Sequence, residues 1–213
     1  MSRHETHEEA ALSLPERYAD PKQKLVRARS IRAIAQYVRL LRGNAYTESR
    51  FRALGTQQAQ FAEQDGFASP LFADDLLTSL AHDGFTDFQI RQMGSTTLLT
   101  NHRSRLASVL SKPVSPRQLY EDLHEQHLHH YDQIWTYRLL HIDAKGCIAE
   151  ARPRESVSEL FKTKHVGSRR MCLFREGVYA AVLGHISSRL AKTAETECVF
   201  LGDSRCLYHM SWD

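Results

Sequence analysis

The end of the chain reads A-E-T-E-C-V-F-L-G-D-S-R-C-L-Y-H-M-S-W (residues 194–212). Two largely apolar runs, 196–201 and 205–212, flank the segment Gly202-Asp203-Ser204. Because Gly and Asp favour tight hairpin turns, this stretch predicts two paired antiparallel strands. Such a hairpin would place Cys198 and Cys206 opposite one another near its base.

Upstream of this hairpin, the sequence predicts a second one and a helix. The runs Q-I-W-T-Y-R-L-L-H-I (133–142) and C-I-A-E-A-R-P (147–153) have strand-like composition and are joined by the turn D-A-K-G. A helix is expected over 179–191. Apolar residues in the first part of the chain recur at helical spacing instead, and predict helices over 22–42, 47–64, 74–82, from 87 onward, and over 117–131. Ser115 and Pro116 are expected to cap and open the last of these. The predicted fold class is α+β, with a helical N-terminal half packed against a C-terminal antiparallel sheet and helices. We divide it into a polar, flexible leader (1–20), a helical N-terminal region (21–115) and an α+β domain (116–213).

Charge and apolar content restrict the setting of the protein. The net charge is +3, which does not by itself require a nucleic-acid partner. The first fifteen residues lack the apolar stretch of a signal peptide, and no apolar run approaches the roughly 20 residues that span a bilayer. We therefore expect a cytoplasmic protein without a membrane partner. Structural disulfides are rare in that compartment, so its four cysteines are expected to be buried, reactive or metal-bound.

Three of the cysteines can converge. If the chain between Cys172 and the final hairpin returns through a helix, Cys172 can reach Cys198 and Cys206. Three thiolates suit a tetrahedral zinc ion that takes one further ligand. Glu195 and His209 are the two candidates, and strand alternation favours Glu195 because His209 lies three residues after Cys206 and so on the opposite face. The alternative is that the three thiols only fill the core as small apolar groups. Cys147 lies outside this arrangement.

The region from Cys172 to Trp212 also resembles a known family. The segments V-L-G-H-I-S-S-R-L (182–190), E-T-E-C (195–198), V-F-L, G-D and C-L-Y-H-M-S-W (206–212) are similar in order and spacing to the signature of the 4-vinyl reductase domain. This module is related to the haem–nitric-oxide-binding and TRAPP-subunit folds. The pattern most resembles the sensory domains of bacterial activators that respond to phenols and xylenes.

The resemblance implies a site and a role. In those sensory domains one Cys, one Glu and two further Cys hold zinc, which corresponds here to Cys172, Glu195, Cys198 and Cys206. It implies a structural zinc and a small apolar or aromatic ligand. It assigns no ligand-binding residues, since E-A-R-P-R (150–154) stands where those sensors have a tryptophan. Three thiolates and a carboxylate leave no position for a reactive water, so we expect a regulatory domain and not an enzyme. Its signal would pass by protein contact.

Two further roles remain open from the sequence. The strongly basic helix expected over 22–42 could bind nucleic acid or an acidic partner, as in a stand-alone adaptor or DNA-associated transcriptional regulator, or it could present a solvated face. Its apolar stripe, which includes Ile34 and Val38, predicts a homodimer in which this helix contributes to the interface, although the same stripe would also serve an internal core. Haem is the other alternative, with His102, His124, His141 or His185 as an axial ligand.

Overall fold

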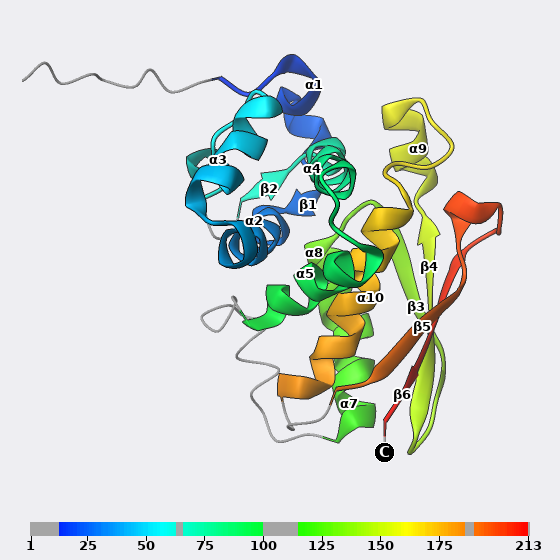
Figure 1. The fold of residues 1–213 in the computed structure, drawn as a ribbon. Coiled ribbons are helices and arrows are strands. Elements are labelled where there is room, and N and C mark those ends of the chain that lie inside the picture. The colour runs from blue at the N-terminus through cyan, green and yellow to red at the C-terminus, as the bar shows by residue number, and fades with distance from the viewer. Residues whose placement is uncertain (1–12, 63–65, 100–114, 186–189, 213) are drawn as a thin grey trace, which may run out of the picture.

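The computed structural model describes residues 13–62, 66–99, 115–185 and 190–212. Helices form one side of the molecule and an antiparallel sheet forms the other (Figure 1). The predicted α+β class is confirmed. A single hydrophobic core connects the two sides, with members from Tyr18 to Trp212.

The helical side is built from short elements joined by tight turns. In chain order they are α1 (Glu16–Ala19), a 3₁₀ helix (Pro21–Gln23), β1 (Val26–Arg27), α2 (Ala28–Arg42), α3 (Asn44–Ala53), a 3₁₀ helix (Gln58–Phe61), β2 (Phe67–Ala68), α4 (Pro70–His82) and α5 (Asp87–Leu99). After the undescribed residues 100–114 come α7 (Pro116–Asp122), a π-helix (Leu123–His127) and α8 (Leu128–Tyr131).

The start of the helical side differs from the sequence expectation. The helix expected over 22–42 begins at Ala28, because Val26 and Arg27 pair with residues 67–68 as a two-stranded ribbon. The segment assigned to a flexible leader is packed from about residue 14 onward: Tyr18 is buried and its hydroxyl donates to Asp75 over 2.6 Å. Residues 1–12 of that leader lie outside the described residues. The Ser115 cap predicted for the helix at Pro116 is present, and its hydroxyl accepts from the Gln118 amide.

The sheet side follows with β3 (Trp135–Ile142), β4 (Gly146–Pro153), α9 (Glu155–Phe161), α10 (Arg169–Val182), a 3₁₀ helix (Leu183–His185), β5 (Lys192–Glu197), a 3₁₀ helix (Val199–Leu201) and β6 (Cys206–Ser211). The strand order is β3-β4-β6-β5 and every pairing is antiparallel. The inner face of the two central strands carries residues 147, 149 and 151 of β4 opposite residues 210, 208 and 206 of β6, all buried.

Helix α10 lies between the sheet and the helical side and contacts both (Figure 1). It crosses α5 so closely that glycine is required on each helix. A Cβ on Gly177 would lie 1.8 Å from the Arg91 carbonyl oxygen, and one on Gly94 would lie 1.9 Å from that of Phe174. The helix expected over 179–191 was wrong in its bounds, since α10 runs from Arg169 to Val182. Cys172 therefore lies within it, in the first turn.

Candidate metal centre

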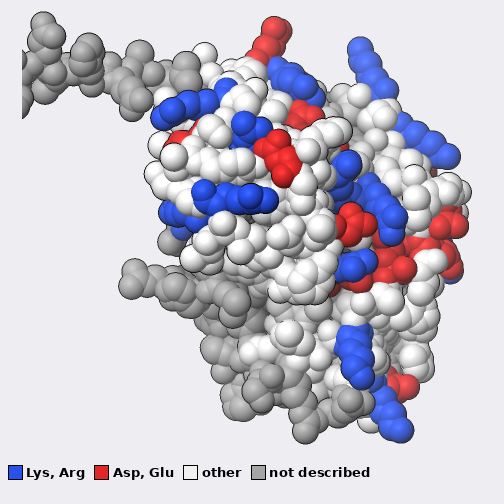
Figure 2. All heavy atoms as spheres, viewed as in Figure 1, with Lys and Arg blue, Asp and Glu red and all other residues white. Residues whose placement is uncertain are grey.

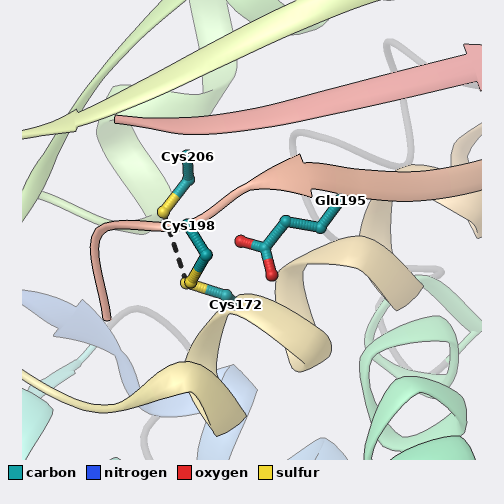
Figure 3. Close-up of side chains that lie close together, drawn as sticks. All are labelled: Cys172, Glu195, Cys198 and Cys206. Atoms are coloured by element: carbon teal, nitrogen blue, oxygen red, sulfur yellow. Dashed lines mark hydrogen bonds between the residues drawn. The ribbon is translucent and has the colours of Figure 1, made fainter. Parts of the chain in front are cut away.

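Four side chains meet at one end of α10. Cys172 comes from α10, Glu195 from β5, Cys198 from the residue after β5, and Cys206 from the first position of β6 (Figure 3). Their potential ligand atoms all lie within 4.8 Å of one another. The three cysteines are buried, and the Glu195 carboxylate points toward their sulfurs. The structure thus brings together the four residues that the sequence resemblance named.

Local interactions hold each ligand-bearing segment in place. Ser168, four residues before Cys172, caps α10: its hydroxyl accepts from the Arg170 amide, and the helix begins at Arg169. After β5, the chain turns through a 3₁₀ helix that ends at Gly202, where φ is +106°. The Asp203 carboxylate accepts from the Cys198 amide over 2.7 Å, and the Cys198 carbonyl accepts from the amides of Leu201 and Asp203. The Gly-Asp pair therefore closes the loop around Cys198.

The spacing suits a tetrahedral metal site. Zinc–sulfur bonds of ~2.3 Å at tetrahedral angles place ligand sulfurs about 3.8 Å apart. The sulfurs of Cys172 and Cys206 are 3.5 Å apart, so a small adjustment would admit the ion. The four cysteines are all free thiols. One Glu195 oxygen, Oε1, is buried and has no hydrogen-bond partner among the described residues, which fits an atom that could coordinate a cation.

The charges of the cluster are coupled. Burial raises the pKa of Glu195 to about 7, and the nearby Cys198 adds to this shift. Hydrogen bonds from Cys172 and Cys198 lower the pKa of Cys206 well below that of an ordinary thiol. The pKa of Cys172 is raised, because it donates within the same network. A set of partly protonated acidic groups held in contact can lose its protons to solvent when a metal ion binds, and can then hold the ion as anions.

Two residues considered from the sequence lie away from the cluster: His209, the other candidate for the fourth ligand, and Cys147, which was expected to lie outside it. His209 is exposed on β6, opposite Ala194 and Ile148, and its side chain is on the outer face of the sheet. Cys147 is buried on β4 and its sulfur contacts that of Met210 at 3.9 Å.

One residue beside the cluster was not predicted from the sequence. Arg175 is 6% exposed and follows Cys172 by one helical turn. Its Nη1 lies 3.8 Å from the Cys172 sulfur and donates to the Tyr208 hydroxyl over 3.1 Å. The spacing of three residues would have placed it beside Cys172, had the helix been expected to start before residue 179.

A cavity of about 80 Å³ lies next to this arginine. Its wall is mostly apolar and comes from both sides of the molecule, with Ile34 of α2, Leu77 of α4, Leu123 of the π-helix and Val178 of α10. Its few polar wall residues include Asp132, Tyr137 and Arg175. The cavity is therefore suited to a small and mainly apolar molecule.

The basic side chains of the segment 22–42 are largely engaged within the protein. Arg29 is buried, and Arg27 donates to the His130 carbonyl and stacks on the Phe67 ring. Arg39 donates to Gln58 over 2.6 Å. On the face shown in Figure 2, lysine and arginine side chains are interspersed with acidic ones. These contacts give the segment a role in packing.

Its apolar stripe is also internal. Ile31, Ile34 and Val38 are buried in the core of the same chain, while Leu40 and Leu41 at the end of α2 are exposed. The expected dimer contact through Ile34 and Val38 is thus corrected to an internal core contact.

Comparison with solved structures identifies the fold. No protein-family model matches the sequence, and no curated protein sequence matches it. An H-NOX protein from S. oneidensis superimposes with a TM-score of 0.67 at 11% identity, covering 88% of this chain and 97% of that one. The chain has an H-NOX-like fold. An H-NOX protein from K. algicida superimposes with a TM-score of 0.60 at 10% identity, covering 87% of this chain and 96% of that one. An oxygen-binding H-NOX domain related to soluble guanylate cyclases superimposes with a TM-score of 0.54 at 12% identity, covering 87% of this chain and 94% of that one.

The resemblance stated from the sequence is thereby confirmed at the level of the H-NOX-like fold, and the 4-vinyl reductase assignment is not. The phenol-responsive sensory domain of the activator PoxR also matches, at 13% identity over 88% of this chain and 75% of that one. Its TM-score of 0.28 is too low to support any conclusion about ligand or metal.

The described residues do not fit a haem, although H-NOX proteins are studied for their haem. The cavity is only about 80 Å³, and no described histidine lines it. Of the four histidines considered from the sequence, His124 has both ring nitrogens engaged, with the Tyr120 carbonyl and the Tyr179 hydroxyl, and His141 is exposed. His102 and the side chain of His185 lie outside the described part. The H-NOX-like fold here therefore surrounds a small apolar cavity.

Proposed function

We propose that this protein is a small-molecule-binding sensory or regulatory domain with a structural zinc held by Cys172, Glu195, Cys198 and Cys206. The observation that carries the proposal is the convergence of three buried sulfurs and a buried, unpartnered carboxylate oxygen within 4.8 Å. Three soft thiolates with one carboxylate favour zinc over harder cations such as Mg²⁺ or Ca²⁺.

Zinc in this position would act as a crosslink. Its ligands come from α10, from β5 and the loop after it, and from β6, so the ion would tie the central helix to the edge of the sheet. With four protein ligands the coordination sphere is complete, which leaves no place for a reactive water. The proposed role is therefore structural, and we propose a binding domain and not an enzyme.

The cavity supplies the proposed ligand site. It lies between the helical side and α10, and most of its wall is apolar. An engineered apolar cavity of about 150 Å³ binds benzene or xenon. A cavity of about 80 Å³ would take a smaller molecule as it stands, or a benzene-sized one after its walls move.

The output is proposed to be contact with another chain, either a second copy or a regulatory partner in the cytoplasm. Exposed apolar side chains at the end of α2 and on α5, Leu40, Leu41 and Phe88, are available for such contact. Among the described residues, no helix has the length and apolar character needed to cross a membrane.

Native mass spectrometry of protein purified without added metal tests this function, because it reports zinc, bound small molecules and oligomeric state together. We expect one zinc per chain in the wild type and in Cys147→Ser, which removes a buried thiol outside the cluster. Cys206→Ser should lose the ion. Wild-type protein free of zinc, or equal zinc in both variants, would rule out the proposed site.

A further inference from the structure

Arg175 belongs to both the cysteine cluster and the cavity wall. From α10, its guanidinium reaches the Cys172 sulfur on one side, and it lines the cavity on the other. It is held by the Tyr137 hydroxyl, which accepts from Nε over 3.2 Å, and by Asp132, which accepts from Nη2 over 3.2 Å. The guanidinium carbon, Cζ, of Arg175 lies 4.5 Å from the centroid of the Trp135 ring. A buried charge with this many partners has a defined position.

The position of the Arg175 guanidinium would affect the stability of a bound metal ion through its charge. A zinc ion with three thiolates and a carboxylate carries two net negative charges in a buried place. A guanidinium in contact with one of the thiolates offsets part of that charge, and low polarity nearby strengthens the effect. Asp132 opposes it, because its carboxylate competes for the same cation from the other side.

The cavity borders the guanidinium. Asp132 and Tyr137 in its wall hold Arg175 by hydrogen bonds, while apolar wall residues such as Leu77 and Val178 leave open space beside it. A molecule that fills the cavity would pack against the guanidinium and exclude water from it. Both changes would hold the cation against Cys172.

We propose that Arg175 couples the two sites, so that an apolar molecule in the cavity makes the cysteine cluster hold zinc more tightly. This inference rests on the proposed function, since it takes both the zinc and the cavity ligand as given. By linkage, zinc must in turn increase the affinity of the cavity for its ligand by the same factor. Arg175 acts here as a positioning residue, through Cys172.

The test measures how fast zinc passes from the protein to a chromogenic chelator. Arg175→Met should speed this transfer about tenfold or more, as loss of a partner of a metal ligand commonly does. Asp132→Asn should slow it, because the competing charge is removed. The matched control is Arg152→Gln, which removes an arginine that bonds Glu150 on β4, and it should leave the rate unchanged.

Filling the cavity tests the coupling itself. Ala73→Leu adds apolar atoms to the wall of α4, and xenon under pressure fills an apolar cavity without any mutation. Each should slow zinc transfer, by about fivefold for the substitution. Neither should have an effect in the Arg175→Met background. Xenon keeps the test available if the larger side chain is not accommodated.

The outcomes separate this inference from the proposed function. Wild-type protein without zinc, or without xenon bound in the cavity, defeats the proposed function and this inference with it. If zinc and xenon both bind, the coupling alone is refuted by equal transfer rates in wild type and Arg175→Met, or by no effect of xenon. Faster transfer in Asp132→Asn as well would also refute it, since general loss of stability predicts that result and charge compensation does not.

Discussion

Substituting Gly177 by Ala tests whether the crossing of α5 and α10 positions the cluster. The added methyl would lie 1.8 Å from the Arg91 carbonyl oxygen and 3.1 Å from the Ser95 amide nitrogen, all of them backbone atoms. The methyl carbon must move more than an ångström away from the Arg91 carbonyl oxygen before their separation reaches an acceptable 3.0 Å. No rotamer change can supply that distance, so the two helices must separate.

The expected cost follows from this geometry. Overpacking typically costs about 1–3 kcal/mol when side chains can adjust. Here only backbone can move, so we expect about 3 kcal/mol or more of lost unfolding free energy, after a gain of about 1 kcal/mol in helix propensity. Because α10 also carries Cys172 and Arg175, zinc transfer to a chelator should become faster.

Urea unfolding of the wild type and the variant provides the measurement. Gly43→Ala is the matched control: with φ +83° and ψ 169° it has a backbone conformation that favours glycine, but an added methyl would meet nothing within 4 Å, so only backbone strain of about 1–3 kcal/mol is expected. If Gly177→Ala were as stable as Gly43→Ala, or more so, the close crossing of the two helices would be refuted.

Two further predictions concern the fourth ligand and the response to acid. Glu195→Ala should lower zinc affinity at least tenfold, while His209→Ala, on the outer face of the same sheet, should leave it unchanged; the reverse order in chelator competition would favour His209 as the ligand. Burial lowers the pKa of His124 from 6.5 to about 4. The unfolded chain therefore binds more protons between these values, and unfolding free energy should fall by about 3 kcal/mol as the pH drops through this window. His124→Gln should lack this component in pH-dependent urea unfolding, and an identical pH profile would contradict it.

Local patterns in the sequence were sufficient for the fold class and for several boundaries. The helix at Pro116 has its expected Ser115 cap, and the two runs at 133–142 and 147–153 pair as β3 and β4. The four cluster residues could be named together because the region from Cys172 to Trp212 resembles a known family. The spacing alone suggested that the three cysteines converge, and it left Glu195 and His209 both open as the fourth ligand.

The missed features depend on contacts between distant segments. Gly177 lowers the helix propensity of α10, so the helix was expected to begin only after it. The close approach of α5 requires a glycine at this position. The strand expected over 196–201 ends at Glu197, because Val199–Leu201 form a 3₁₀ turn closed by Asp203. Helix α9 was not expected, and the cavity beside Arg175 could not be, since its wall comes from helices that are far apart in the chain.

X-ray absorption at the zinc edge, on protein purified without added metal, tests the central claim most directly. The account predicts a four-coordinate zinc with three sulfur neighbours at about 2.3 Å and one oxygen at about 2.0–2.2 Å. Absence of zinc, a shell with fewer than three sulfurs, or the outer-shell scattering of an imidazole ring would contradict it.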